Sequence, residues 1–433
     1  MRVCEVLFSP KYWFLDGRSK SGVVLIAFLL VLFAPLSALG RVWTDIKGRE
    51  LRGATLVSHD EKEVVFNLVG GKEYRMPKAR LSEKDRKYLA SGEIPPGAEG
   101  DFNWDAPWPI MVELKAKPAV TMVMEDKDGK RYIYESENFR FTCNVRLTGA
   151  VVSDFSSLFE ATQLYCRALP LAFDGGRKNK GRYDVFLFET EEQYVKAGGP
   201  PSSAGVFVDE EELTGVLAPL TGLGVRKIGS GYMRDRDKQN DTLVHEITHQ
   251  LTPEAYISTD AMGWFVEGIA EYLGSTPYRA RRFKVRGNID EIIEDVTAYG
   301  EDDTEGWALG TEFVAPALVD FMTMSYREFT GANTNFNYGF GALLTTYFVQ
   351  FDGGGDAAAL KSFLKVLRMS NESLEGKGDP FSESHSQQLK QIELREKHGL
   401  RALLGTRTFE ELQEEVAKAW QRKGVEISFR QPR

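Results

Sequence analysis

Hydrophobic and polar residues follow different patterns in the first and second halves of the chain. Up to about residue 220, short apolar runs predict strands, as in FRFTC at 139–143 and YDVFLFE at 183–189. Beyond about residue 240, apolar residues recur three and four positions apart, which predicts mainly helices. Strands followed by helices indicate an α+β fold, with a mixed sheet before a mainly helical half. The ranges expected to be helical are 155–169, 191–197, 289–298, 312–324, 338–351, 357–367 and 409–422.

The first 40 residues have the composition of a targeting segment. No charge occurs from Ser21 to Gly40, basic residues precede this stretch, and small residues end it at 38–40. These are the parts of a secretory signal peptide, so we expect residues 1–40 to be removed and the protein to be exported to the periplasm or the extracellular space. An uncleaved signal anchor is the alternative, because twenty uncharged residues are enough to span a bilayer. Pro35 and the small residues favour cleavage.

Residues 41–91 consist of short alternating runs separated by turn residues, which predicts a small β domain. The Pro- and Gly-rich residues 92–103 are expected to form a linker, and residues 104–433 the main domain. The small domain resembles the Sla homology domain, an SH3-like β-barrel, which implies binding of a protein or cell-envelope ligand; a solubilising spacer is the alternative. The resemblance rests on Arg41, Trp43-Thr44, Gly48, VVFNL at 64–68, Gly71-Lys72, MPKARLS at 76–82, Asp85 and Tyr88-Leu89.

Composition argues against nucleic acid as a partner and leaves open whether the cysteines form a disulfide. Of the 433 residues 42% are hydrophobic and 27% charged, as in ordinary folded proteins, and the net charge is −9. No basic stripe is present, so nucleic acid is not an expected partner. Removal of the signal takes away Cys4 and leaves Cys143 and Cys166, which either form a disulfide in an oxidising compartment or remain two buried thiols. Without a C-x-x-C spacing, a cysteine metal site is not expected.

The sequence LVHEITHQL at 243–251 has the residue spacing of a metal site. On a helix His245 and His249, four positions apart, share one face and can bind the same ion. Glu246 lies beside that face; zinc lowers the pKa of a bound water, and this carboxylate can take the proton. Two surface histidines are the alternative, but the apolar flanking residues indicate a buried helix, where such a cluster needs a partner.

A second helix is expected at 260–274, ending at Gly274. Glu267 and Glu271 lie one turn apart on it, and no Lys or Arg occurs between residues 261 and 274 to neutralise them. Two such carboxylates need a cation or a histidine opposite. A metzincin site is excluded, because Thr252 and Ala255 occupy the positions at which that pattern has Gly and His.

HEITH at 245–249 and EGIAE at 267–271, seventeen residues apart, resemble the gluzincin metallopeptidases, the superfamily of thermolysin and aminopeptidase N. The resemblance implies that Glu267 is the third zinc ligand and that Glu271 orients His245. It extends loosely from about residue 137 to the C-terminus, where it is similar to a bacterial exported branch. The G-x-M-E-N motif of the exopeptidases is absent, so aminopeptidase activity is not implied.

Gluzincins often stabilise the oxyanion with a Tyr or His from a later helix. Tyr338, which opens the expected helix 338–351, is the first candidate and Tyr232 the second; a core tyrosine is the alternative for Tyr338. Strands expected at 204–208 and 215–220 precede the zinc helix and are suited to pair with an extended peptide.

These features predict an exported zinc-dependent peptidase in which Glu246 activates the attacking water. The alternative function is a catalytically silent zinc-binding scaffold whose N-terminal barrel binds proteins or the cell envelope. Retention of Glu246 argues against the scaffold, since a protein without catalysis has no use for the base.

Overall fold

The structure, a computed structural model, describes residues 43–47, 49–51, 54–59, 62–68, 72–83, 85–86, 103–173, 175–176, 178–209, 213–235, 241–257, 262–298, 306–374 and 396–432. The expected signal peptide at 1–40 lies outside these residues. Within the described part of the chain, no helix is long and apolar enough to cross a membrane. The described residues fall into two compact units, one within Asp105–Lys361 and Leu403–Arg433, the other within Leu15–Trp104 and Ser362–Ala402.

The N-terminal unit contains two small antiparallel sheets around buried Trp43, Val64, Met76 and Leu81. Among the described strands no closed barrel is detected, so the SH3-like domain stays a prediction. Two of these strands are only two residues long, and an isolated bridge pairs Asp45 with Leu81. The first sheet pairs β1 (Trp43–Thr44) with β2 (Glu50–Leu51), and the second contains β3 (Ala54–His59), β4 (Glu63–Leu68) and β5 (Lys72–Pro77), followed by the 3-10 helix η2 (Lys78–Arg80).

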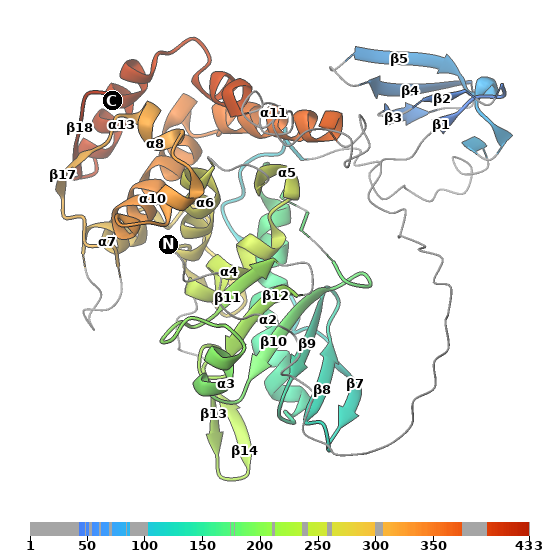
Figure 1. The fold of residues 1–433 in the computed structure, drawn as a ribbon, viewed down its shortest axis with the longest axis vertical. Helices are drawn as coiled ribbons and strands as arrows, with labels where there is room; N and C mark the ends of the chain where they lie inside the picture. The colour runs from blue at the N-terminus through green and yellow to red at the C-terminus, as the bar shows by residue number, and fades with distance from the viewer. Residues whose placement is uncertain are drawn as a thin grey trace, which may run out of the picture. The chain divides into compact units, whose positions relative to one another are not determined.

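A six-stranded sheet is the centre of the larger unit (Figure 1). Its strand order is β11-β12-β10-β9-β8-β7, so β11 lies at one edge. Strand β10 runs parallel to both of its neighbours, and the other pairs are antiparallel. The strands are β7 (Thr121–Asp126), β8 (Arg131–Glu135), β9 (Phe139–Cys143), β10 (Tyr183–Phe188), β11 (Val206–Asp209) and β12 (Thr214–Pro219).

Helix α2 (Gly149–Ala168) covers part of this sheet. It begins after Thr148, whose hydroxyl accepts a hydrogen bond from the first turn and so caps the helix. Phe155 and Phe159 pack edge-on against Phe141 of β9, with ring centroids 5.3 and 5.2 Å apart. Such aromatic pairs bury large apolar areas in a preferred geometry, and they fix the helix on the sheet.

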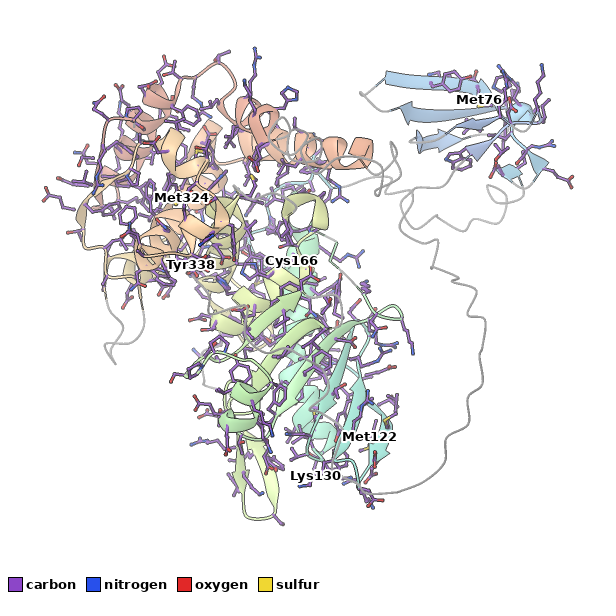
Figure 2. All side chains as sticks on the ribbon, in the orientation of Figure 1. Met76, Met122, Lys130, Cys166, Met324 and Tyr338 are labelled. Carbon is purple, nitrogen blue, oxygen red and sulfur yellow. The ribbon has the colours of Figure 1, made fainter. Side chains whose placement is uncertain are left out.

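The two remaining cysteines are free thiols. Cys143 lies in β9 and Cys166, labelled in Figure 2, in α2, and both are buried. Of the two alternatives left open by the sequence, the structure therefore has the buried thiols. Burial raises the pKa of both thiols, which disfavours the thiolate needed for metal binding or nucleophilic reaction.

Three helices carry the residues of interest: α4 (Asp241–Leu251), α6 (Gly263–Gly274) and α10 (Thr334–Gln350). The side-chain amide of Gln250 donates to the main-chain carbonyl of Asp184 (2.7 Å), which ties α4 to strand β10. Helices α6 and α10 cross closely at Gly268, where an added Cβ would overlap with the carbonyl oxygen of Gly341 and the hydroxyl of Thr345. A glycine is required at 268 because any side chain would push the two helices apart.

The rest of the larger unit is built from shorter elements. The helix predicted at 312–324 is wrong: Glu312–Ala315 is strand β17, paired in parallel with β18 (Glu426–Phe429), and a helix, α8 (Leu318–Met322), forms only after Pro316. The other elements are α3 (Glu191–Lys196), α5 (Glu254–Ile257), α7 (Ile289–Thr297), α9 (Tyr326–Phe329), α13 (Phe409–Gln421), the 3-10 helix η3 (Asp352–Gly354), the hairpin β13 (Val225–Ile228) and β14 (Gly231–Arg234), and a sheet of β6 (Val112–Glu113), β15 (Tyr278–Arg279) and β16 (Arg282–Phe283). Helix α11 (Ala358–Leu374) begins in the larger unit, and from Ser362 on it belongs to the second unit.

The mixture of a sheet with a mainly helical C-terminal half confirms the α+β class. Most predicted helices form within a few residues of their expected bounds, α13 (Phe409–Gln421) among them. Its sequence explains this accuracy, since Thr408 and Glu411 form a capping box that fixes where the helix starts.

Candidate metal centre

Helix α4 presents His245, Glu246 and His249 because its other face is held in the core. Leu243, Val244, Ile247 and Leu251 of this helix are buried. With 3.6 residues per turn, fixing that apolar face leaves positions 245 and 249 side by side on the face turned towards α6.

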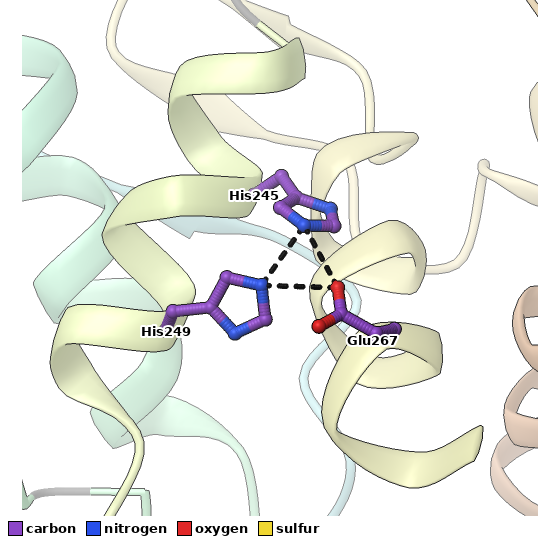
Figure 3. Close-up of side chains that lie close together, drawn as sticks. All are labelled: His245, His249 and Glu267. Atoms are coloured by element: carbon purple, nitrogen blue, oxygen red, sulfur yellow. Dashed lines mark hydrogen bonds and ion pairs between the residues drawn. The ribbon is translucent and has the colours of Figure 1, made fainter. Parts of the chain in front are cut away.

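Glu267 on α6 completes a triangle with the two histidines (Figure 3). The Nε2 atoms of His245 and His249 are 2.9 Å apart, and the Glu267 Oε2 atom lies 3.3 Å from the first and 3.2 Å from the second. The Glu267 side chain is 2% exposed, against 12% for each histidine. Among the described residues, this is a group whose ligand atoms all lie within 4.8 Å of one another.

The donor set fits a tetrahedral cation. A zinc ion with bonds of about 2.1 Å has ligand atoms about 3.4 Å apart, close to the distances in this triangle. The Oε2 atom of Glu267 is buried and meets no hydrogen-bond donor of good geometry in the described part of the chain. A buried carboxylate oxygen without a donor is costly, and a cation beside it would remove that cost.

Glu271, one turn after Glu267, holds the other side of His245. Its Oε1 atom is 3.0 Å from the His245 Nδ1 atom, and its Oε2 atom accepts a hydrogen bond from the indole of Trp307 (3.2 Å). A proton on Nδ1 that faces a carboxylate leaves the Nε2 lone pair of the neutral ring directed to the centre of the triangle. The geometry therefore suits His245 to metal binding.

Glu246 lies beside the triangle and is held by the sheet. The main-chain N–H of Phe207, in the edge strand β11, donates to its Oε2 atom at 2.6 Å. Burial raises the pKa of the Glu246 carboxyl, while the two histidines act in the opposite direction. A carboxylate with a raised pKa accepts protons more readily near neutral pH, which is the property of a general base.

The buried charges of the triangle shift one another's pKa values. Burial alone would lower the pKa of His245, but Glu267 and Glu271 outweigh it and hold that pKa well above its usual value. Burial would likewise raise the pKa of Glu267, but His249 and His245 hold it well below its usual value. Carboxylate and imidazole thus each favour the charged form of the other.

Tyr338 lies at the site, at the start of α10 (Figure 2). Its ring stacks on that of His245, with centroids 6.3 Å apart, and packs at a tilt of 40° against Trp307, with centroids 5.1 Å apart. The hydroxyl of nearby Tyr326 donates to Glu267 Oε1 at 2.6 Å.

Tyr232, the second candidate, lies elsewhere. Its hydroxyl donates to Glu189 (2.6 Å), and the β13–β14 hairpin that carries it projects away from α4 and α6 (Figure 1). This arrangement does not favour a role for Tyr232 at the metal centre.

Three contributors to the site carry no motif that sequence reasoning could use. Tyr326 lies on α9, a helix of one turn, and Trp307 in a loop, so neither has a periodic relation to the histidines. The third is the main-chain N–H of Phe207, which every residue except proline possesses. The capping box between Ser325 and Glu328 was the one available sign that a helix begins at Tyr326.

Comparison with known proteins adds no relative: no family model, no curated protein and no solved structure matches the chain.

Proposed function

We propose that this protein is an exported zinc-dependent peptidase of gluzincin type. The single observation that carries the proposal is the meeting of His245, His249 and Glu267 around one point, with the Glu246 carboxylate beside it. This is the ligand set of a catalytic zinc site, which keeps one position for water or substrate.

Zinc held by these three residues would lower the pKa of a bound water and polarise the carbonyl of a peptide bond. Glu246 would take the proton of the attacking water and pass it to the leaving nitrogen, since a buried carboxylate can hold that proton between the two steps. Glu271 would keep His245 in the required tautomer, and the hydroxyl of Tyr338, whose ring stacks on that of His245, would donate to the oxygen that becomes negative.

Strand β11 supports a peptide as the substrate. It is the edge of the six-stranded sheet, and its Phe207 N–H reaches the Glu246 carboxylate. An extended peptide that pairs with this edge beside Phe207, whose own N–H stays with Glu246, would place its main chain next to the base.

The proposal is tested by metal analysis and by Glu246→Gln. We expect one zinc per chain in both proteins, and cleavage of a peptide mixture, mapped by mass spectrometry, that falls about 10²–10⁴-fold in the variant. Equal activity of the two proteins, or the absence of stoichiometric zinc, would contradict the proposal.

One observation favours a second function, a silent zinc-binding scaffold. The ligand side chains are nearly inaccessible, at 12% and 2% exposure, and the Oε2 atom of Glu246 is engaged by the Phe207 main chain. Stoichiometric zinc without cleavage of any peptide in the mixture would select this function, and binding would then be assigned to the N-terminal unit, as the Sla-homology resemblance implies.

Export rests on the sequence of residues 1–40. N-terminal sequencing of protein recovered from the producing cells decides between the two alternatives. A mature chain that begins near Arg41 supports cleavage, and an intact N-terminus supports a signal anchor.

A further inference from the structure

The two oxygens of the Glu267 carboxylate have different surroundings. Oε1 accepts a hydrogen bond of 2.6 Å from the Tyr326 hydroxyl. Oε2 faces the Nε2 atoms of His245 and His249, at 3.3 and 3.2 Å, and receives no donor of good geometry from the described residues. One oxygen is thus occupied by a phenol, and the other points at the centre of the triangle.

This difference matters for coordination, because a carboxylate can bind a metal through one oxygen or two. Two histidines and one Glu267 oxygen give three ligand atoms and leave the fourth position of a tetrahedral ion open. If both oxygens of Glu267 were bound, they would fill that position. A short hydrogen bond to a charged acceptor is among the stronger ones in proteins, so it can keep Oε1 away from the ion.

Tyr326 is itself held in place. Its short helix α9 starts with a capping box, in which the Glu328 N–H donates to the Ser325 hydroxyl (3.3 Å) and the main-chain N–H of Ser325 donates to the Glu328 carboxylate (3.1 Å). The helix ends at buried Phe329, whose carbonyl accepts from the Asn337 side chain of α10 (2.7 Å). The ring of Tyr338, also on α10, packs against that of Phe329, with centroids 5.6 Å apart. The short helix that carries the Tyr326 phenol is therefore held by contacts with α10.

We propose that Tyr326 is a positioning residue that makes Glu267 a one-oxygen ligand and so keeps the fourth position of the metal open. The inference rests on the zinc site of the proposed function. It assigns to Tyr326 an action through Glu267, separate from any contact of Tyr326 with substrate.

The test is Tyr326→Phe, which removes the hydroxyl and keeps the ring. We expect one zinc per chain, a zinc affinity that differs about 10–100-fold from the parent, and an X-ray absorption spectrum that gains one oxygen neighbour. The matched control is Tyr347→Phe. Tyr347 lies on α10, and its hydroxyl also donates to a carboxylate, that of Glu415 (3.0 Å). The control should leave the zinc affinity and the spectrum unchanged.

A second variant keeps the test valid if Tyr326→Phe loses stability. In Glu267→His the imidazole offers a single ligand atom to the metal. It cannot bind the metal through two atoms, so the hydroxyl of Tyr326 is not needed to prevent this. We expect Tyr326→Phe to have no further effect on zinc affinity in that background. An equal effect in both backgrounds overturns the proposal.

The outcomes separate this inference from the proposed function. If the parent binds one zinc and Tyr326→Phe has the same affinity and spectrum, the positioning role is wrong and the zinc site stands. If the parent binds no zinc, both are wrong.

Discussion

At the scale of single residues, the candidate site depends on carboxylates that each contact more than one partner. Glu267 is shared between the histidines and Tyr326, and Glu271 between His245 and Trp307. Such shared groups fix ring orientation and tautomer without contacting a substrate, and their loss changes how well a ligand is presented.

Glu271→Gln tests this at His245. The amide keeps the size of the side chain and loses the charge, so the His245 ring becomes less basic and is less strictly held. We expect zinc affinity to fall about 10–100-fold, measured by competition with a chromophoric chelator. Glu410→Gln, at an exposed position of α13, is the control, and an equal loss there would show that the effect is not specific.

Asp295 on α7 gives a pH-dependent prediction. Burial, opposed by a hydrogen bond from Ser275 and helped by Glu271, raises its pKa from 3.8 to about 6. The folded protein therefore retains a proton that the unfolded chain has lost, and stability falls as pH rises from about 4 to 6. Asp295→Asn removes that cost, so we expect it to be more stable than the parent at pH 8 by about 1–3 kcal/mol and nearly equal below pH 4.

Urea unfolding at both pH values measures this difference. A gain of equal size at pH 8 and below pH 4 would show that the ionisation of Asp295 is not its cause.

Sequence spacing predicted some of these residues and not others, for a physical reason. His245, His249, Glu267 and Glu271 lie on two helices, where the 3.6-residue period converts spacing into direction. Tyr326 and Trp307 reach the site through loops and a single turn, so their positions depend on the tertiary packing of α10 and α7.

At the scale of secondary-structure elements, the distance between α6 and α10 decides where Glu267 and Tyr338 lie. The two helices touch at Gly268, with Gly341 and Thr345 on the opposite helix. The same scale explains the wrong helix at 312–324: residues 312–315 have an apolar pattern that fits either state, and pairing with β18, more than a hundred residues later, selects the strand.

Gly268→Ala is expected to destabilise the protein by about 1–3 kcal/mol, because the added methyl group meets the main chain of α10, which cannot rotate away. Chemical denaturation measures the change. The matched control is Gly149→Ala at the start of α2, where an added Cβ has no atom within 4 Å among the described residues. The control should be neutral or slightly stabilising, and equal losses in both variants would contradict the close crossing.

At the scale of the whole molecule, the site joins segments that are distant in the chain. Residues from Phe207 to Tyr338 meet there, and they come from the sheet edge, four helices and a loop. A cation bound by α4 and α6 would therefore add a direct link between these two helices.

Metal removal should lower the stability of the larger unit accordingly. A ligand that binds only the folded state adds about 4 kcal/mol at a free concentration near 1,000 times its Kd. We expect calorimetric Tm to fall in EDTA and to recover on addition of zinc. His249→Ala should show neither change, and a similar response of this variant would place the metal elsewhere.

The contact between Phe207 and Glu246 has a consequence for solubility. Strand β11 ends its sheet, and an open sheet edge can recruit strands from other molecules and begin aggregation. A charged side chain that occupies an edge amide obstructs such recruitment, since a foreign strand would have to displace it and bury its charge. The Glu246 carboxylate, proposed as the base, therefore also disfavours self-association through the edge strand β11.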